Sequence, residues 1–249
     1  MQANPSRAQS VNAANGLAPG APGGLVLGVD TCGPSGSVAL DRLTAEKLQI
    51  LGQIELAGRS YSATLVAAVA ELLGEVGVGP RELACIVAVH GPGSFTGVRV
   101  GLSAVKGLAE PGGTPVVVVS RLAVLAHKAG TQSAALDAHR HEVFLRIGGA
   151  SAKTREVLAS AGDLTAIPDP PAEIALCDDA AAEVILAAWP AVRLIRVEAP
   201  SAADAVDLAR AQIAAGEFVD LALLDGHYLR RSDAEIFGEP ASAASSQRA

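Results

Sequence analysis

The glycine-rich run HGPGSFTG, residues 90–97, is the most informative part of the sequence for chemistry. It precedes a helix predicted over Val98–Ala109, and the free N–H groups at a helix start attract anions such as phosphate. The run is neither a Walker A nor a G-x-G-x-x-G pattern. Gly97 and Gly101 lie one turn apart, so they could instead let another helix approach closely. We favour this packing role and keep phosphate binding, with Ser94 as ligand or helix cap, as the alternative.

Two acidic residues stand at turns between short predicted strands. Asp30 ends the apolar run from Leu25 and is followed by the turn TCGPS, while Asp137 lies at the turn within residues 133–147. In a nucleotide-binding fold such carboxylates hold a hydrated metal ion or a water beside the phosphates. The alternative is an aspartate that only forms the turn. The candidate nucleotide or phosphate ligands are therefore Asp30, Thr31, Ser94 and Asp137.

The potential metal ligands do not form a recognisable site. His139 and His141 would share one face of a strand, but no third ligand is evident near them, so two exposed turn histidines explain the pattern better. Cys32, Cys85 and Cys177 are far apart and form no C-x-x-C pair. We predict neither a metal site nor a disulfide framework.

The strands and helices predicted around the glycine run indicate the fold class. Residues 62–76 form a strong predicted helix that is apolar nearly all round, so it is either buried inside the domain or turned toward another protein. The alternation of strands and helices predicts an α/β fold in two lobes, each opening on a strand–turn–strand unit with an aspartate. A loose, proline-rich connection is expected up to Pro171, and residues 221–231 close the fold. The expected units are a disordered extension at 1–24, a first lobe at 25–119, a second lobe at 120–237 with one helix packing back on the first lobe, and a loose tail at 238–249.

Composition excludes some classes of protein. Half of the 249 residues are hydrophobic, which supports a sizeable core, and no uninterrupted apolar stretch is long enough for a membrane span. The formal net charge is −7, and there is no run of Lys or Arg. Such a surface repels nucleic acid phosphates, so tight binding of RNA by this chain alone is disfavoured.

These stretches, in this order and spacing, resemble the TsaB family, also called YeaZ. Family members begin with a strand–Asp–Thr–hairpin similar to LGVDTCGPSGSVAL, and their glycine motif is matched almost letter for letter by GPGSFTGVRVGLSAVKGLA. Their Asp-Ala-Arg-x-Gly-Glu-Val segment is similar to ALDAHRHEVF, and their final Tyr-Leu-Arg matches residues 228–230. The resemblance runs from about Leu25 to about Ser232.

The resemblance implies a two-lobed fold of the actin/hexokinase-like (ASKHA) class, with a ribonuclease H-like motif in each lobe. It implies that this chain binds the catalytic subunit TsaD and acts together with the ATPase TsaE. The resulting complex would transfer a threonylcarbamoyl group to the adenosine beside the tRNA anticodon. This chain would be a cytoplasmic, non-catalytic subunit. ATP or ADP would bind at the complex interface, tRNA would be reached only through the complex, and a homodimer is a further expected assembly.

The resemblance also implies which surface pairs with TsaD. In the family the two helices of the first lobe pack against their equivalents in the partner, and here these helices are residues 62–76 and 98–109. The predicted partner-binding residues are Leu65, Val66, Val69, Leu72, Leu73, Val76, Gly97, Val98, Gly101, Leu102 and Val105.

Two departures from the related catalytic subunit favour a non-catalytic role. That subunit has an H-x-x-x-H metal pair on its first helix, whereas residues 59–64 here contain no histidine, and Tyr61 stands where TsaB proteins have His before Ser62. His141 replaces the glycine of the second acidic motif. The alternatives are an ATP-dependent enzyme of the kinase or carbamoyltransferase type that uses Asp30 and Asp137, and a glycoprotease-like peptidase. The peptidase is disfavoured because GPGSFTG is not a G-x-S-x-G elbow.

Overall fold

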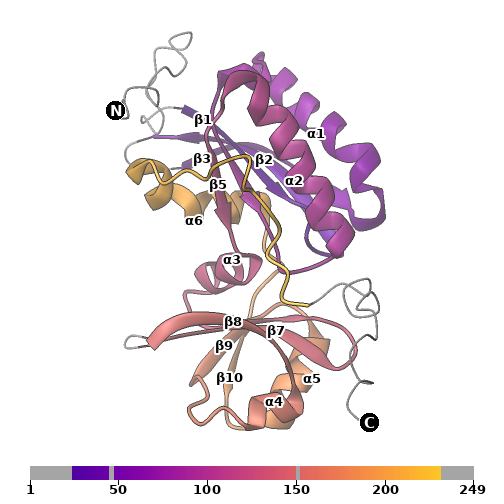
Figure 1. Ribbon diagram of the computed structural model, residues 1–249, viewed down its shortest axis with the longest axis vertical. Coiled ribbons are helices and arrows are strands. Elements are labelled where there is room, and N and C mark those ends of the chain that lie inside the picture. The colour runs from indigo at the N-terminus through magenta and orange to yellow at the C-terminus, as the bar shows by residue number, and fades with distance from the viewer. Residues whose placement is uncertain (1–23, 45–47, 150–151, 231–249) are drawn as a thin grey trace, which may run out of the picture.

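The chain folds into two lobes stacked along its long axis (Figure 1). The computed structural model describes residues 24–44, 48–149 and 152–230. Each lobe is built on a five-stranded sheet. The first sheet contains β1 (Gly24–Asp30), β2 (Ser35–Leu43), β3 (Leu48–Ala57), β4 (Leu83–Val89) and β5 (Val116–Val119). The second contains β6 (Ala134–Asp137), β7 (Glu142–Gly149), β8 (Ala152–Ser160), β9 (Glu173–Leu176) and β10 (Arg193–Arg196).

The two sheets have the same topology. The first has the order β3-β2-β1-β4-β5, and the second, read from its other edge, has the order β8-β7-β6-β9-β10. In both, the first three strands form an antiparallel meander, and the last two strands run parallel to the first. This repeated order is that of the ribonuclease H-like motif, so the predicted two-lobed ASKHA-like α/β fold is confirmed.

Within the described residues, six α-helices connect and cover the sheets. They are α1 (Tyr61–Val76), α2 (Phe95–Ala109), α3 (Arg121–Lys128), α4 (Ala161–Thr165), α5 (Asp179–Ala188) and α6 (Ala202–Ala215), with short 3-10 turns at Gly58–Ser60, Pro80–Glu82 and Glu110–Gly112. Helices α1 and α2 lie side by side against the first sheet (Figure 1). Among the described residues, none of the helices has the length and apolar character needed to cross a membrane.

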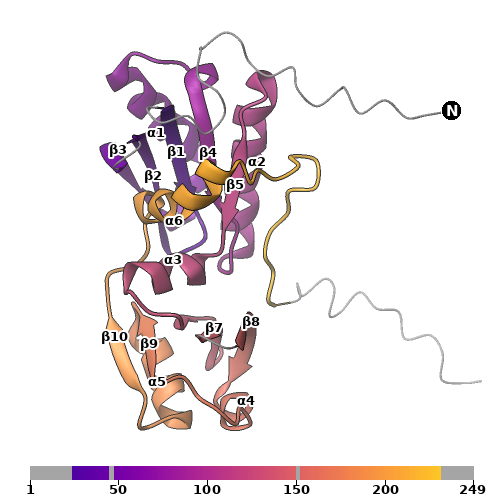
Figure 2. The ribbon, with the colours of Figure 1, turned by 90° about the vertical axis from the view of Figure 1, so that its left-hand side faces the viewer.

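Helices α3 and α6 each follow one sheet in the chain and pack against the other. Helix α3 lies between the two sheets (Figure 2) and buries Leu122 and Leu125 in the second-lobe core. Helix α6 follows the second sheet in the chain but buries Val206 and Ile213 in the core of the first. Its close approach requires Gly28, where an added Cβ would lie 2.6 Å from a backbone oxygen of α6. The lobe boundaries given above remain a prediction.

The expected loose connection before Pro171 is wrong for much of its length. Residues 152–160 form strand β8 and residues 161–165 form helix α4. Strand β8 pairs with β7 at the edge of its sheet, so its outer positions tolerate charged residues such as Arg155, while Glu156 is held by contacts inside the protein. These charges obscure the apolar alternation on which the prediction depended. The expected extension at 1–24 and tail at 238–249 lie outside the described residues, apart from Gly24.

Candidate functional site

The glycine run fits tightly around the turn between β1 and β2. An added Cβ on Gly93 would lie 2.1 Å from the carbonyl oxygen of Cys32, and one on Gly97 would lie 2.1 Å from that of Thr31. The Ser94 N–H donates to the Cys32 oxygen at 2.7 Å. Because these contacts fill the space beside the glycines with protein backbone, they favour the packing role of the run over phosphate binding.

Thr31 packs against the glycines of α2. Its side chain is buried, and its hydroxyl donates to the Gly97 carbonyl at 2.7 Å. An added Cβ on Gly101 would lie 2.3 Å from the Thr31 hydroxyl. The expectation that Gly97 and Gly101 receive another helix is therefore corrected: they receive the β1–β2 turn of their own lobe.

Asp30 is held in a buried ion pair. Its Oδ2 atom lies 3.2 Å from Arg121 Nε, its Oδ1 atom accepts the Cys32 N–H at 2.8 Å, and both charged side chains are buried. Burial alone would lower the pKa of Arg121, but the neighbouring Asp30 carboxylate raises it above its usual value. The carboxylate is thus neutralised from within the protein. This leaves it poorly suited to hold a hydrated metal ion or a phosphate-side water.

Tyr61, the first residue of α1, contacts the β1–β2 turn. Its side chain is buried, and its hydroxyl donates to the Gly33 carbonyl at 2.8 Å. Burial, with a smaller contribution from Asp30, raises the pKa of the Tyr61 phenol, so the hydroxyl keeps its proton. The residue at the family's histidine position is therefore a structural donor here, a role that the sequence analysis missed.

Arg121 was also missed, although the sequence contains a signal for it. It is the first residue of α3, where a positive charge opposes the helix dipole and is unfavourable without a partner. Ser120 caps this helix by accepting the Ala123 N–H. A cation directly after a helix cap therefore suggests a buried anion near that helix start.

Ser94 and Asp137 also make local contacts. The Ser94 hydroxyl accepts the Gly97 N–H at 3.3 Å, as a helix cap does. Asp137 accepts the His139 N–H at 2.8 Å and lies 2.8 Å from Nδ1 of the same histidine. Both contacts favour the simpler alternatives, a helix cap and a turn-forming aspartate.

The β6–β7 turn has a strained backbone. His139, Arg140 and His141 have φ values of 60°, 58° and 58°, in the left-handed region that favours glycine. His141 is thus the position at which a glycine, as in the family motif, would fit with less strain. In the part of the chain that the structure describes, no three or more His, Cys, Asp or Glu residues are placed to hold a metal ion.

Most of the predicted partner-binding residues point into the protein. The buried ones are Leu65, Val69, Leu72, Leu73, Gly97, Val98, Gly101, Leu102 and Val105, and Val76 is half-buried. This burial corrects their assignment to the surface. Val66 is the exception, since 62% of it is exposed. The larger aliphatic residues of α1 face the sheet, because they bury more apolar area there than alanine does.

The outward face of α1 and α2 is instead built mainly from small residues, with Glu71 and Glu75 on α1 and Arg99 on α2 as exposed charged positions. On α1 the exposed positions include Ala63, Val66, Ala67, Ala70 and Gly74, which recur at helical spacing. On α2 they are Thr96, Arg99, Ser103 and Gly107. At the start of α2, Phe95 contacts both the Arg99 guanidinium, 3.9 Å from its ring centre, and the Tyr228 ring. Small side chains on two adjacent helices would let the helices of another protein approach closely.

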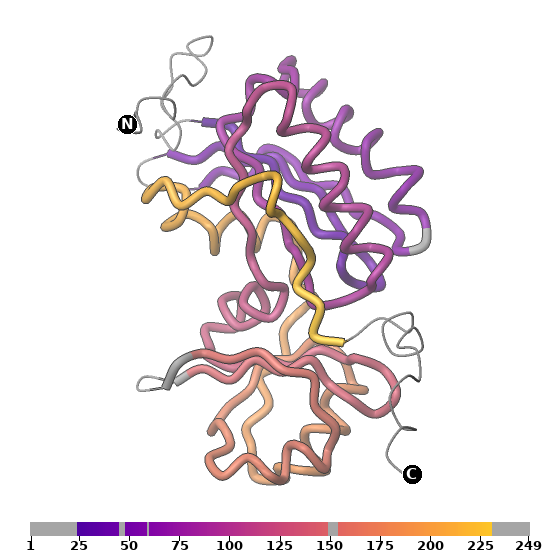
Figure 3. The backbone as a smooth tube through the Cα atoms, viewed as in Figure 1, coloured from indigo at the N-terminus to yellow at the C-terminus, as the bar shows by residue number. Residues whose placement is uncertain are grey.

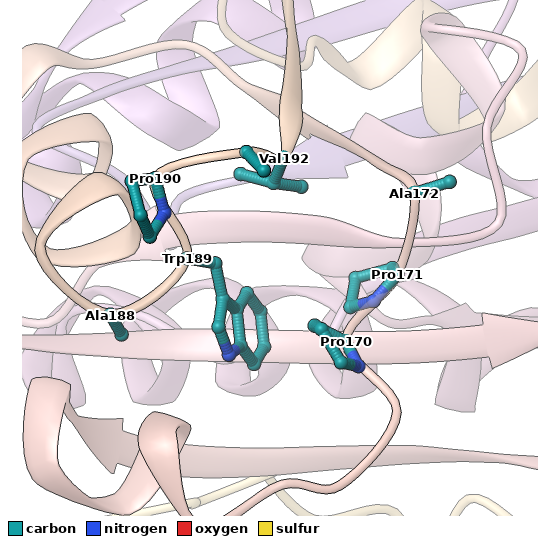
Figure 4. A pocket seen from close by; sticks show the side chains of 8 residues that line it. Pro170, Pro171, Ala172, Ala188, Trp189, Pro190 and Val192 are labelled. Carbon is teal, nitrogen blue, oxygen red and sulfur yellow. The ribbon is translucent and has the colours of Figure 1, made fainter.

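A separate apolar pocket lies between the segments that lead into β9 and β10 (Figure 4). It has a volume of about 400 Å³ and is lined by residues 170–172 and 188–192. Trp189 forms part of its wall and donates its indole N–H to the Leu164 carbonyl at 3.1 Å. The pocket contains none of the predicted site residues.

Comparisons with known proteins agree with these motifs. The family model for tRNA N6-adenosine threonylcarbamoyltransferase (TsaD) matches residues 50–184. The tRNA threonylcarbamoyladenosine biosynthesis protein TsaB of Haemophilus influenzae is 36% identical over 125 residues, which cover 48% of this chain and 51% of that protein. TsaB of Bacillus subtilis is 35% identical over 123 residues, 48% of this chain and 52% of that protein. The chain thus spans about half the length of the curated relatives it matches.

A solved structure extends the match beyond this half. The structure of YeaZ from Pseudomonas aeruginosa is 29% identical, with a TM-score of 0.66, and the alignment covers 83% of this chain and 100% of that one. The glycine motif, the duplicated topology and these matches lead to one assignment. The chain belongs to the TsaD family of tRNA N6-adenosine threonylcarbamoyltransferases and, within it, to the TsaB (YeaZ) group.

Proposed function

We propose that this chain is a non-catalytic subunit of the machinery that makes threonylcarbamoyladenosine in tRNA. In this role it binds a TsaD-like catalytic subunit through the outward face of α1 and α2. The names of its TsaB relatives support the pathway. The observation that carries the binding role is the exposed small-residue face of two adjacent helices, on which Val66 is a large exposed apolar residue.

The contacts of Asp30 support the non-catalytic part of the proposal. In an ATP-dependent ASKHA enzyme this acid would act near the phosphates, but here its carboxylate accepts hydrogen bonds from Arg121 and from the Cys32 N–H. Freeing it for a ligand would leave the Arg121 guanidinium buried without a partner, which is strongly unfavourable. This argues against the kinase-like alternative. Ser94, the nucleophile of the peptidase alternative, acts as a helix cap.

The remaining partners follow from the same proposal. The formal net charge of −7 disfavours tight tRNA binding by this chain alone, so tRNA is reached through the complex. A TsaE-like ATPase, and ATP or ADP at the complex interface, belong to the assembly rather than to this chain. In the absence of TsaD, the same helix face supports a homodimer, since its small residues would also let the helices of a second copy approach closely.

The test is co-purification of the chain with the TsaD-like protein of the same organism, followed by light scattering with and without ATP. A stable 1:1 complex is expected. Val66→Asp should weaken it by roughly a hundredfold or more, because binding would bury an unpaired charge. Leu186→Asp is the matched control: Leu186 is also exposed, at 41%, but lies on α5 in the second lobe.

The outcomes separate the parts of the proposal. Equal affinity of the Val66→Asp and wild-type chains would refute the α1–α2 surface. Equal loss in both variants would point to a different surface or to a general effect of added charge. Two separate species under every condition would remove the proposed subunit role. Val69→Asp serves as a folding control, since that side chain is buried and the substitution should unfold the isolated chain.

A further inference from the structure

A segment after the last helix ties the two lobes together. Residues 216–230 leave α6, pass along the first lobe and reach the second (Figure 3). At the first lobe the Val219 N–H donates to the Val116 carbonyl of β5 at 2.9 Å. At the second, the Arg230 guanidinium donates to the Ala138 carbonyl at 2.8 Å. We call residues 216–230 the strap.

His227 is the point at which the strap contacts both lobes at once. Its N–H donates to the carbonyl oxygen of His90, at the end of β4, at 2.7 Å. The two imidazole rings are stacked, with centroids 5.4 Å apart and an interplanar angle of 20°. His227 Nε2 lies 2.9 Å from Oε2 of Glu156 on β8. One residue of the strap therefore links the first lobe to the edge strand of the second.

Glu156 is held in a fixed position to receive this contact. It accepts the Ser120 hydroxyl at 2.7 Å and the Arg146 guanidinium at 2.8 Å, and only 9% of its side chain is exposed. Burial would raise the pKa of Glu156, but the hydrogen bonds from His227, Ser120 and Arg146 lower it below its usual value. The carboxylate is therefore charged near neutral pH. It acts as a preorganised acceptor for His227.

The glycine run also accommodates the strap. Gly91 has a φ of +113°, and an added Cβ there would lie 2.8 Å from the His227 carbonyl oxygen. A side chain at this position would push the strap away from β4. The first glycine of the run thus has a role that neither phosphate binding nor contact with the β1–β2 turn explains.

The protonation of His90 makes the contact between the strap and the first lobe depend on pH. Burial, and then the neighbouring His227 ring, lower the pKa of His90, while Glu156 and a hydrogen bond to the backbone of Asp225 act in the opposite direction. With the strap docked, His90 resists protonation. With the strap released, it takes up a proton near its ordinary pKa of about 6.5. Docking is therefore favoured above that pH and weakens as the pH falls below it.

We propose that the strap is a pH-sensitive latch between the lobes, closed when His90 is neutral and opened when His90 carries a proton. A charge on the half-buried His90 ring would lie against the His227 ring, and the neighbouring Glu156 carboxylate already accepts hydrogen bonds from His227, Ser120 and Arg146. The latch fixes the orientation of the lobes. Its evidence does not rest on the proposed TsaD contact, although the strap residue Tyr228 also contacts Phe95 at the start of α2.

Hydrogen exchange of the full chain, followed by mass spectrometry on peptides from the strap, tests the latch at about pH 7.5 and about pH 5.5. After correction for intrinsic exchange, protection of the wild-type strap should fall by roughly threefold or more at the lower pH. His90→Gln should remove this fall, because the amide stays neutral. His127→Gln is the matched control: this exposed histidine of α3 pairs with Asp207, away from the strap, so the wild-type fall should persist.

Two results would overturn the latch: a wild-type strap whose protection does not change with pH, or a His90→Gln strap that loses protection as the wild type does. Peptides from β4 monitor folding in every variant. If His90→Gln does not fold, His227→Gln replaces it, since its amide can still donate to Glu156 while removing the second imidazole. Glu156→Gln should lower strap protection at both pH values, and unchanged protection would exclude Glu156 as the second-lobe anchor.

Discussion

Asp41 is predicted to make the protein less stable as the pH rises. It lies in β2 and is fully buried, and among the described residues neither of its carboxylate oxygens has a hydrogen-bond partner. Burial, with a smaller contribution from Asp207 on α6, raises the pKa of Asp41 from 3.8 to about 7. The folded chain therefore keeps a proton that the unfolded chain has already lost between these values. Stability falls as the pH rises through this window, and the loss is complete above about pH 7.

The magnitude follows from the size of the shift. A shift of about three units at about 1.36 kcal/mol per unit makes the loss at most about 4 kcal/mol. Asp41→Asn keeps the shape and removes the charge, so it should match the wild type near pH 4 and exceed its stability by up to about 4 kcal/mol near pH 8. Urea unfolding followed by circular dichroism at both pH values measures this. Asp169→Asn, an exposed loop position, controls for the loss of one acid. Parallel pH profiles of the wild type and Asp41→Asn would refute the argument.

Further substitutions probe the Asp30–Arg121 ion pair, helix α2 and the β6–β7 turn. Arg121→Met should destabilise the chain by about 3–5 kcal/mol, because it leaves Asp30 buried and unpaired, and adding Asp30→Asn should restore part of this in urea unfolding. Gly101→Ala should lower the stability of the fold by about 1–3 kcal/mol, because the added Cβ would overpack. Gly107→Ala on the same helix should raise the stability by about 0.5–1 kcal/mol, because the described residues place no other group within 4 Å of the added Cβ. Thermal melts distinguish the two variants. His141→Gly should stabilise by about 0.5–1 kcal/mol in the same assay, because relief of left-handed strain outweighs the flexibility of glycine in the unfolded chain.

Local sequence patterns predicted the elements of the fold better than their orientation. The apolar runs that form β1, β4 and β5 and the glycine run before α2 are strong signals, because each depends on residues close together in the chain. Helix α1 is apolar on both sides, so its periodicity could not distinguish the leucines that face the sheet from the alanines that face outward. That distinction depends on the larger area that leucine buries, which becomes visible only when the sheet is in place.

Contacts between distant residues explain most of what the sequence did not show at the site. Asp30 pairs with Arg121, 91 positions later, and Glu156 contacts His227, 71 positions later. No local pattern connects such residues, although a cation at the start of α3 was a usable signal.

The equivalent acids of the two lobes both make contacts within the chain. Asp30 and Asp137 end the first strand of equivalent sheets, where an ASKHA enzyme would place acids near the phosphates. Here each carboxylate is used inside the protein: Asp30 holds Arg121 beneath the glycine run, and Asp137 holds His139 in a left-handed turn. A buried carboxylate is strongly unfavourable without a partner, and the Arg121 guanidinium supplies one for Asp30. The Arg121 contact thus stabilises the first lobe at the end of β1.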